Sequence, residues 1–339
     1  TIDASTGALS FISAPDYELP TDVGGNNVYD VTVQVSDGSL IDTQDIAVTV
    51  TNANEAPVIT SNGSGTTAAV NVAENSTSVT TVTSTDVDAG ATAAYSIVGG
   101  ADSAKFTIDA STGALSFVSA PDYESPTDAG GNNVYDVKVQ VSDGILTDTQ
   151  DIAVTVTNVN EAPVITSNDG GTTAAVNVAE NSTSVTTVTS TDVDAGATAT
   201  YSIVGGADAA KFTIDASTGA LSFVSAPDFE NKLDAGADNV YDLTVQVNDG
   251  LGGSDTQDIA VTVTNVNEAP VITSNGGGVT ATPINVAENT TAVTTVTSTD
   301  VDAGATATYS IIGGADAAKF TIDASTGALS FISAPDYES

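Results

Sequence analysis

The sequence predicts an all-β chain in which one two-sheet sandwich is repeated along its length. Apolar and polar residues alternate with a period of two in many short runs, as expected for strands with one buried face. Clusters of Gly, Asn and Asp separate these runs and have the composition of turns. Hydrophobic residues make up 40% of the chain but aromatic residues only 5%, and there is no Trp. Val, Ile and Ala must therefore fill the cores, which favours strands over helices.

One sequence pattern returns at a nearly constant interval, which indicates a tandem array. The string Thr-Ile-Asp-Ala-Ser-Thr-Gly-Ala-Leu-Ser-Phe begins at Thr1, Thr107, Thr213 and Thr321, so one repeat is about 106 residues long. The chain is expected to be a piece of a longer array, with apolar strand faces exposed in its partial repeats. The expected pieces are the closing half of a repeat at 1–54, complete repeats at 56–160 and 162–267, and the opening part of a fourth at 269–339.

Within one complete repeat, the alternation predicts seven or eight short strands. The clearest run carries Tyr135, Val137, Val139 and Val141 in alternation with polar residues. An all-β domain of this length, with strands this short, has the size of an immunoglobulin-like two-sheet sandwich. The predicted strands of the second repeat include 70–72, 79–82, 95–97, 106–108, 115–117, 135–141 and 152–156.

The charged residues exclude several classes of function. The formal net charge is −39, from 44 acidic residues against 5 Lys or Arg. Such a surface repels nucleic acid, whose binding requires clustered cations, and suits multivalent cations or salty surroundings. Without Cys or His, the chain has no disulfide, no His-activated nucleophile and no thiolate or imidazole zinc site. No apolar run approaches the roughly 20 residues that span a bilayer.

Certain carboxylates recur at fixed places that a solvated surface does not explain. In the second repeat these are Glu74 at the end of an early strand, the D-x-D pair Asp86 and Asp88, and the D-x-E pair Asp122 and Glu124. Two carboxylates carried in a D-x-D loop are a common way to bind one hard cation such as calcium. Further members of the set are Asp143, then Glu180, Asp192, Asp194, Asp228, Glu230 and Asp249 in the third repeat, Asp16 and Glu18 in the first, and Asp300 and Asp302 in the fourth.

A short linker with unusual oxygen content stands between successive repeats. At Asn158-Val-Asn-Glu-Ala-Pro163, three oxygen-bearing side chains fall within four residues, and the proline makes the segment short and partly stiff. The three linkers carry Asn52, Asn54 and Glu55, then Asn158, Asn160 and Glu161, then Asn265, Asn267 and Glu268.

Taken in order, these motifs resemble a cadherin repeat. The strings V-A-E-N, T-D-V-D-A-G, F-T-I-D-A-S-T-G-A-L, P-D-Y-E, V-Q-V-S-D-G and N-V-N-E-A-P-V-I follow the order of that family, and the repeats are most similar to those of very large bacterial surface adhesins. The resemblance implies Greek-key sandwiches arranged as an elongated rod on the cell surface, with calcium bound at each junction. At the second junction it implies ligands from Glu74, Asp122, Glu124, Asn158, Asn160, Glu161, Asp192, Asp194 and Asp249.

Two departures from the family pattern bear on the number of ions. Asn158 stands where the family linker usually has Asp, and the linker is one residue shorter. We therefore expect two to three calcium ions per junction.

The resulting prediction is a calcium-rigidified spacer segment of a surface adhesin, which is not an enzyme because its acids lie at junctions and not in a pocket. Its partners are calcium and the neighbouring repeats of the same chain. The alternative is that the repeats themselves bind a cell-surface partner, either homophilically or through a glycan. Two other groups of acids are assigned no metal: Asp109 is expected in a turn, and Asp148 and Asp151 on a solvated strand face.

Overall fold

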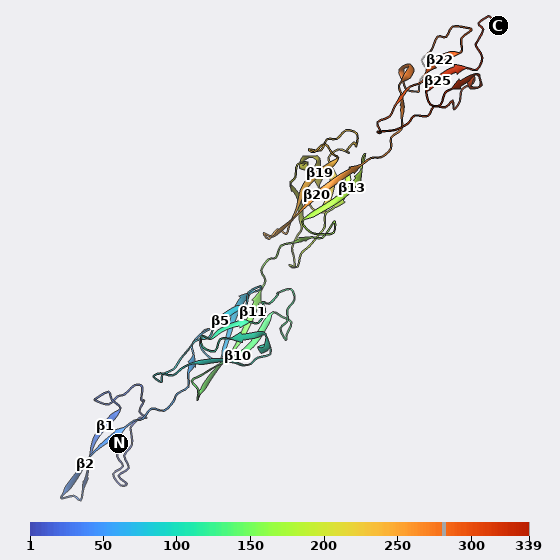
Figure 1. Ribbon diagram of the computed structural model, residues 1–339. Helices are drawn as coiled ribbons and strands as arrows, with labels where there is room; N and C mark the ends of the chain where they lie inside the picture. Colours follow the sequence, from blue (N-terminus) through green and yellow to red (C-terminus); the bar gives the residue numbers. More distant parts are fainter. Residues whose placement is uncertain (280–282, 339) are drawn as a thin grey trace. The chain divides into compact units, whose positions relative to one another are not determined.

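The chain is built of short β-strands and divides into two compact units, Thr1–Val159 and Asn160–Ser339 (Figure 1). The structure is a computed structural model that describes residues 1–279 and 283–338. Over these residues it contains strands and four short 3-10 turns but no α-helix, as the sequence predicted. No helix within the described ranges is long and apolar enough to cross a membrane.

The first unit contains one complete sandwich. A four-stranded sheet, in the order β4-β11-β10-β7, packs against a three-stranded sheet in the order β5-β9-β8, and β3 pairs with β6 beside them. This sandwich has nine strands, more than the seven or eight predicted. The strands that the alternation did not reveal are β3 and β6, each two residues long. The elements are β3 Val58–Ile59, β4 Thr67–Ala73, β5 Ser78–Thr81, β6 Ser84–Thr85, β7 Ala94–Gly99, η1 Ser103–Lys105, β8 Phe106–Ile108, β9 Ala114–Phe117, β10 Val134–Ser142 and β11 Thr147–Thr157.

The core of this sandwich follows the predicted alternation. In β10, Tyr135, Val137, Val139 and Val141 are all buried, whereas the residues between them face outward or are half-buried. The Tyr135 ring meets Phe117 edge-on, with 5.2 Å between centroids, a geometry that the ring quadrupoles favour. One buried face on each sheet is therefore enough to specify the sandwich.

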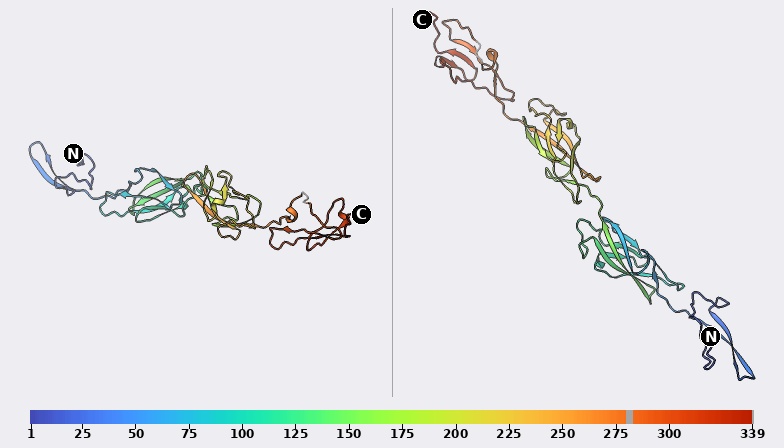
Figure 2. Two further views of the ribbon diagram at one scale, coloured as in Figure 1. Left: turned by 90° about the horizontal axis from the view of Figure 1, so that it is seen from above. Right: turned by 180° about the vertical axis from the view of Figure 1, so that it is seen from behind.

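The first unit also holds the hairpin of β1 Val28–Ser36 and β2 Ile41–Thr49, which forms a separate two-stranded sheet (Figures 1 and 2). Val35 is 70% exposed, whereas Val141 at the same place in the complete repeat is fully buried. The predicted exposure of this strand face is confirmed.

The second unit contains a sandwich with the same sheet orders, β13-β20-β19-β16 and β14-β18-β17, and then further strands of a fourth repeat. The borders of the four repeats remain predictions. The elements are β12 Val164–Ile165, β13 Thr173–Ala179, β14 Ser184–Thr187, β15 Ser190–Thr191, β16 Thr200–Gly205, η2 Ala209–Lys211, β17 Phe212–Ile214, β18 Ala220–Phe223, β19 Val240–Asn248, β20 Ser254–Thr264, β21 Val271–Ile272, η3 Ser274–Gly276, β22 Ala292–Thr295, β23 Ser298–Thr299, η4 Ala317–Lys319, β24 Phe320–Ile322 and β25 Ala328–Phe331.

Two polar side chains of β11 have roles that the alternation did not predict. The expected solvated position of Asp148 is wrong, because its Oδ2 accepts a hydrogen bond from the backbone N–H of Ile59 at 2.9 Å and so fixes β3. Gln150 is fully buried, and its Nε2 donates to the carbonyl oxygen of Gly65 at 3.0 Å. Asp151, in contrast, forms an exposed ion pair with Lys138 at 3.2 Å, as expected of a solvated face.

The recurrent D-A-S-T-G string forms a tight turn in each repeat, which confirms the structural role expected for Asp109. In the third repeat, the Asp215 carboxylate accepts the N–H of Thr218 at 2.8 Å and the hydroxyl of Ser217 at 2.8 Å. These bonds, that from Thr218 first, lower the pKa of Asp215 from 3.8 to about 2. Glycine closes the turn at Gly219 because φ is +71° and a Cβ would lie 2.1 Å from the carbonyl oxygen of Val188.

Acid should remove the contribution of Asp215 to stability. Because the folded-state pKa is the lower one, this contribution is complete above pH 3.8 and is lost as the pH falls to about 2. Asp215→Asn retains an acceptor oxygen but does not titrate. The difference in urea midpoint between wild type and variant should therefore shrink when the pH is lowered from about 5 to about 2. A difference that stays constant over this range would contradict the assignment.

Candidate metal centres

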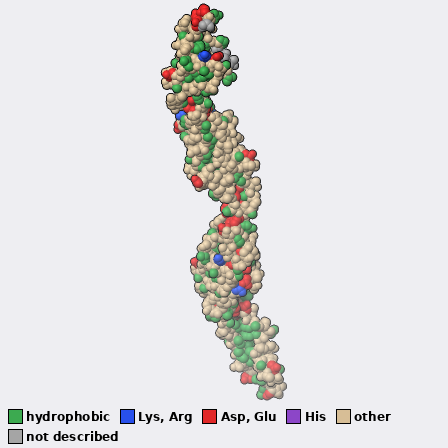
Figure 3. Space-filling view, turned by 90° about the vertical axis from the view of Figure 1, so that its right-hand side faces the viewer, with side chains coloured by type: hydrophobic (Ala, Val, Ile, Leu, Met, Phe, Trp, Pro, Cys, Tyr) green, Lys and Arg blue, Asp and Glu red, His purple; other side chains and the backbone are tan. Residues whose placement is uncertain are grey.

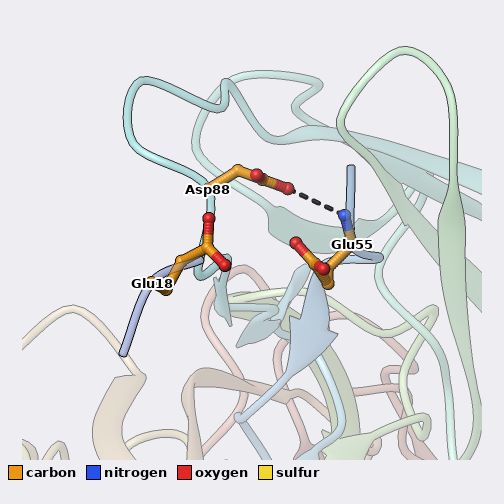
Figure 4. Close-up of side chains that lie close together, drawn as sticks. All are labelled: Glu18, Glu55 and Asp88. Carbon is orange, nitrogen blue, oxygen red and sulfur yellow. Dashed lines mark hydrogen bonds between the residues drawn. The ribbon is translucent and has the colours of Figure 1, made fainter. Parts of the chain in front are cut away.

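Carboxylates that are far apart in the sequence meet in the first unit. Glu18 precedes the β1–β2 hairpin, Glu55 lies in the linker before β3, and Asp88 lies in the loop after β6. Each offers an oxygen, and these oxygens lie within 4.8 Å of one another. Figure 4 shows the three side chains directed toward a common space, with the backbone N–H of Glu55 donating to Asp88 Oδ2 at 2.8 Å. Three carboxylates at this separation repel one another unless a cation neutralises them.

Other triads of carboxylates follow the same rule within a single unit. Each combines the glutamate of a V-A-E-N motif, which follows an early strand in the two complete repeats, with members of the D-x-E segment or the linker. They are Glu74 with Asp122 and Glu124, Glu180 with Glu230 and Glu268, and Glu288 with Asp336 and Glu338.

The glutamate at the end of β4 connects two parts of the candidate site. Glu74 is only 3% exposed, and its Oε2 accepts the N–H of Tyr123, inside the D-x-E segment, at 2.7 Å. Its Oε1 accepts the N–H of the linker residue Val159 at 2.8 Å. Glu180 makes the same two bonds, each 2.8 Å long, to Phe229 and Val266. One buried carboxylate therefore sets the distance between the D-x-E segment and the linker in each complete sandwich.

Two of the D-x-D loops leave a buried carboxylate oxygen without a protein partner. Oδ1 of Asp86 accepts the N–H of Asp88 at 2.9 Å, and Oδ1 of Asp192 accepts that of Asp194 at the same distance. The second oxygen of Asp86 and of Asp192 is buried without a hydrogen bond, as is Oε2 of Glu268. A buried anionic oxygen left in this state is costly, so these positions fit a cation.

The linker asparagines contact carboxylates of the repeat that follows and, in one case, also of the repeat that precedes. In the first unit, Nδ2 of Asn52 donates to Asp88 and Nδ2 of Asn54 donates to Asp143, both at 2.7 Å. The second unit repeats the latter contact between Asn160 and Asp249, also at 2.7 Å. Nδ2 of Asn265 donates to two carboxylates, Glu230 at 3.1 Å and Asp302 at 2.8 Å.

Further hydrogen bonds connect linker residues to carboxylates of the same compact unit or to the next residue of the linker. Asn158 donates to Glu124 at 3.3 Å, and the N–H of Glu161 donates to Asp194 at 2.7 Å. Asn267 donates to the carbonyl oxygen of its neighbour Glu268 at 2.9 Å.

The local charge is reflected in the pKa values of the grouped acids. Desolvation, and then the negative charges of Glu18 and Asp88, raise the pKa of Glu55. Desolvation also raises the pKa of Glu230 and of Glu268, each of which lies near Glu180. On the face in Figure 3, acidic side chains lie in several groups whereas lysines are few, so cations of the chain itself do not offset this charge.

The structure brings some of the predicted ligands together in the carboxylate triads, whereas others bond to backbone or amide groups outside these triads. Asp16 and Asp228 bond backbone N–H groups of their own turns, for example Glu18 to Asp16 at 3.0 Å. Asp143 and Asp249 instead meet the linker amides. Among the described residues, the predicted ligands outside the triads named above include Asp16, Asp86, Asp143, Asp192, Asp228, Asp249, Asp300 and Asp302.

The sequence analysis missed a second set of acids that holds the loop next to the D-x-E segment. Asp102 is 5% exposed and accepts the N–H groups of Ala129 and Asp136 at 2.7 and 2.9 Å. Asp128 accepts the N–H groups of Asn132 and Asn133, both at 3.0 Å. Asp208 and Asp234 make the corresponding bonds in the third repeat, and this recurrence is the sequence pattern from which the role of these acids could have been predicted.

The donor set fits calcium better than zinc. It consists of carboxylate and amide oxygens, and the chain has no His or Cys. Calcium takes six to eight oxygen ligands in flexible geometry, whereas zinc prefers nitrogen and sulfur.

Comparison with curated proteins finds similar cadherins in animals. The chain is 32% identical to human Protocadherin Fat 1 over 202 residues, which are 57% of this chain and 4% of that protein. It is 30% identical to mouse Cadherin EGF LAG seven-pass G-type receptor 2 over 352 residues, covering 99% of this chain and 11% of the receptor. Halomucin of Haloquadratum walsbyi is 60% identical over 35 residues, 10% of this chain. The chain thus spans a small part of the length of these relatives.

Solved structures show the same fold. Mouse Cadherin-23 EC22-24 matches with a TM-score of 0.51 at 23% identity, over 85% of this chain and 91% of that chain. Protocadherin Gamma B7 extracellular cadherin domains 1-4 match with a TM-score of 0.55 at 19% identity, over 100% and 82%. The sequence profile of the Cadherin domain matches residues 68–159 and 174–265, more than half of the chain. The chain therefore belongs to the cadherin domain family.

Proposed function

We propose that this chain is a segment of a large cell-surface adhesin, of the kind that bacteria display, in which calcium stiffens successive repeats into a spacer. The observation that carries the proposal is the triad in Figure 4, in which Glu18, Glu55 and Asp88 come from one repeat, the linker and the next repeat. A cation held by all three restricts the linker because each ligand belongs to a different segment. The same residues without a cation repel one another.

The residues that would hold calcium divide into three sources at each junction. The preceding repeat contributes its D-x-E segment and, at the second and third linkers, its strand-end glutamate. The linker contributes Asn, Asn and Glu. The following repeat contributes its D-x-D loop and, at the first and second linkers, the Asp after its long strand. Bound calcium supplies charge neutralisation and a rigid cross-link. The proposal places two to three ions at each junction, at sites of the extracellular type, whose Kd is roughly 10⁻⁴–10⁻³ M.

An extracellular location and a role in adhesion are supported by the family. The relatives are cadherins and protocadherins. The near-identity of the repeats favours a spacer, since a rod uses one unit many times. A net charge of −39 is tolerated where salt or calcium screens it.

Removing calcium should convert a stiff array into a flexible one. Small-angle scattering of the chain with millimolar calcium should give a larger maximum dimension than the same sample with EGTA, because the linkers become hinges when their acids repel. Magnesium, which prefers fewer protein ligands and retains its waters, serves as the control ion. A maximum dimension that does not change on chelation would contradict the spacer mechanism.

A single change in the first triad should weaken calcium binding at that site alone. Asp88→Asn keeps the shape of the side chain but removes one charge, and should raise the Kd of one class of sites about tenfold or more in calorimetry. Asp109→Asn is the matched control, because Asp109 belongs to a turn distant from the linkers in sequence and bonds its own backbone. Equal effects of both variants would mean that general acidity, and not a defined site, holds the ion.

A further inference from the structure

An asparagine outside the carboxylate triads closes the loop before each long strand. Nδ2 of Asn133 donates to the carbonyl oxygen of Tyr123, the middle residue of the D-x-E segment, at 2.8 Å. Asn27 makes the same bond to Tyr17 at 2.8 Å, and Asn239 makes it to Phe229 at 2.9 Å. The contact thus recurs wherever a D-x-E segment and this loop are both present among the described residues.

This bond completes a clamp on the D-x-E segment. The N–H of Tyr123 donates to Glu74 at 2.7 Å, and its carbonyl oxygen accepts from Asn133. The two bonds hold the two peptide planes that flank the Tyr123 Cα. Asp122 and Glu124 are attached to the far ends of these planes, so the clamp limits where both carboxylates can lie.

Asn133 is itself anchored on two other sides. Its backbone N–H donates to Asp128 at 3.0 Å, and its carbonyl oxygen accepts the N–H of Val156, near the end of strand β11, at 2.8 Å. Val156 precedes the linker residue Asn158 by two positions. The asparagine therefore joins the D-x-E segment to the strand that leads into the linker.

The side-chain amide is held at a cost. Oδ1 of Asn27, Asn133 and Asn239 is buried without a hydrogen-bond partner, and Asn239 as a whole is only 2% exposed. A buried acceptor left unsatisfied is unfavourable. The backbone at Asn133 has φ of +61°, a conformation that Asn and Gly tolerate better than other residues. Because the same arrangement recurs in three repeats, we infer that the asparagine is present for the hydrogen bond that its Nδ2 donates.

We propose that Asn27, Asn133 and Asn239 are positioning residues that pre-organise the D-x-E carboxylates for calcium. The inference rests on the proposed calcium-binding function. It assigns no metal contact to the asparagines, which act through the peptide groups of the segment. By holding the carboxylates before the ion arrives, they reduce the conformational entropy that binding must remove.

The test uses the full chain with Asn27→Gly, Asn133→Gly and Asn239→Gly combined. Glycine accepts the positive φ without strain but lacks the Nδ2 donor. Calorimetry should show calcium binding about two- to tenfold weaker, as expected when one hydrogen bond is lost. The Tm in EGTA should fall, because one buried hydrogen bond is lost at each position, and the rise in Tm on adding calcium should shrink in addition. The control combines Asn26→Ser, Asn132→Ser and Asp238→Ser, which alter the same loop without touching the D-x-E segment, and should bind as the wild type does.

The outcomes separate this inference from the proposed function. If the wild type binds no calcium, the proposed function fails. If the wild type binds and the glycine variant binds equally well, or loses equal stability with and without calcium, only the positioning role is overturned. If the triple variant does not fold in EGTA, Asn133→Gly alone provides the test, because it should weaken one class of sites and leave the others unchanged.

Discussion

The arrangement of the candidate centres depends on one hydrogen-bonded carboxylate, that of Glu74 and its counterparts. A buried carboxylate is tolerated only when donors surround it, and here the donors are two backbone N–H groups from segments about 36 residues apart in the chain. Because these N–H groups belong to the D-x-E segment and the linker, the requirement to satisfy Glu74 fixes both of them. The sandwich thus transmits its rigidity to the D-x-E segment and to the start of the linker.

Backbone N–H groups and side-chain amides stabilise most of the acids of this chain, and lysine does so rarely. The N–H of Ile145 and the amide of Asn54 lower the pKa of Asp143, and the amide of Asn160 does the same for Asp249. Asn52, Asn54, Asn160 and Asn265 give the linker regions a set of neutral donors. Such contacts keep the acids oriented, but they leave the net negative charge in place.

The sequence was sufficient for the fold because its information is local and repeated. Period-two alternation located the strands around Tyr135 and Ile152, and recurrence located Glu74, Asp88 and Glu124 among 44 acids. It was insufficient for Asp148, Asp102 and Gln150, whose partners are backbone groups up to 89 residues away. Whether a polar side chain on a strand faces water or a backbone N–H depends on how distant loops pack over it. The alternation of polar and apolar residues along one strand does not predict this packing. The two-residue strands β3 and β6 escaped for a related reason, because two residues cannot display a period.

The pairing of β4 with β11 has a mechanical consequence. These strands, the first long strand and the last of the repeat, run parallel over seven paired positions, from Thr67 beside Asp151 to Ala73 beside Thr157. A force that pulls the beginning of the repeat away from its end therefore acts along the strands and in opposite senses on the two of them. It loads the whole ladder of hydrogen bonds in shear, so that they must break together and not one after another as in a hairpin opened from its end. A repeat built in this way resists tension along the chain far better than the modest strength of any one of its bonds suggests.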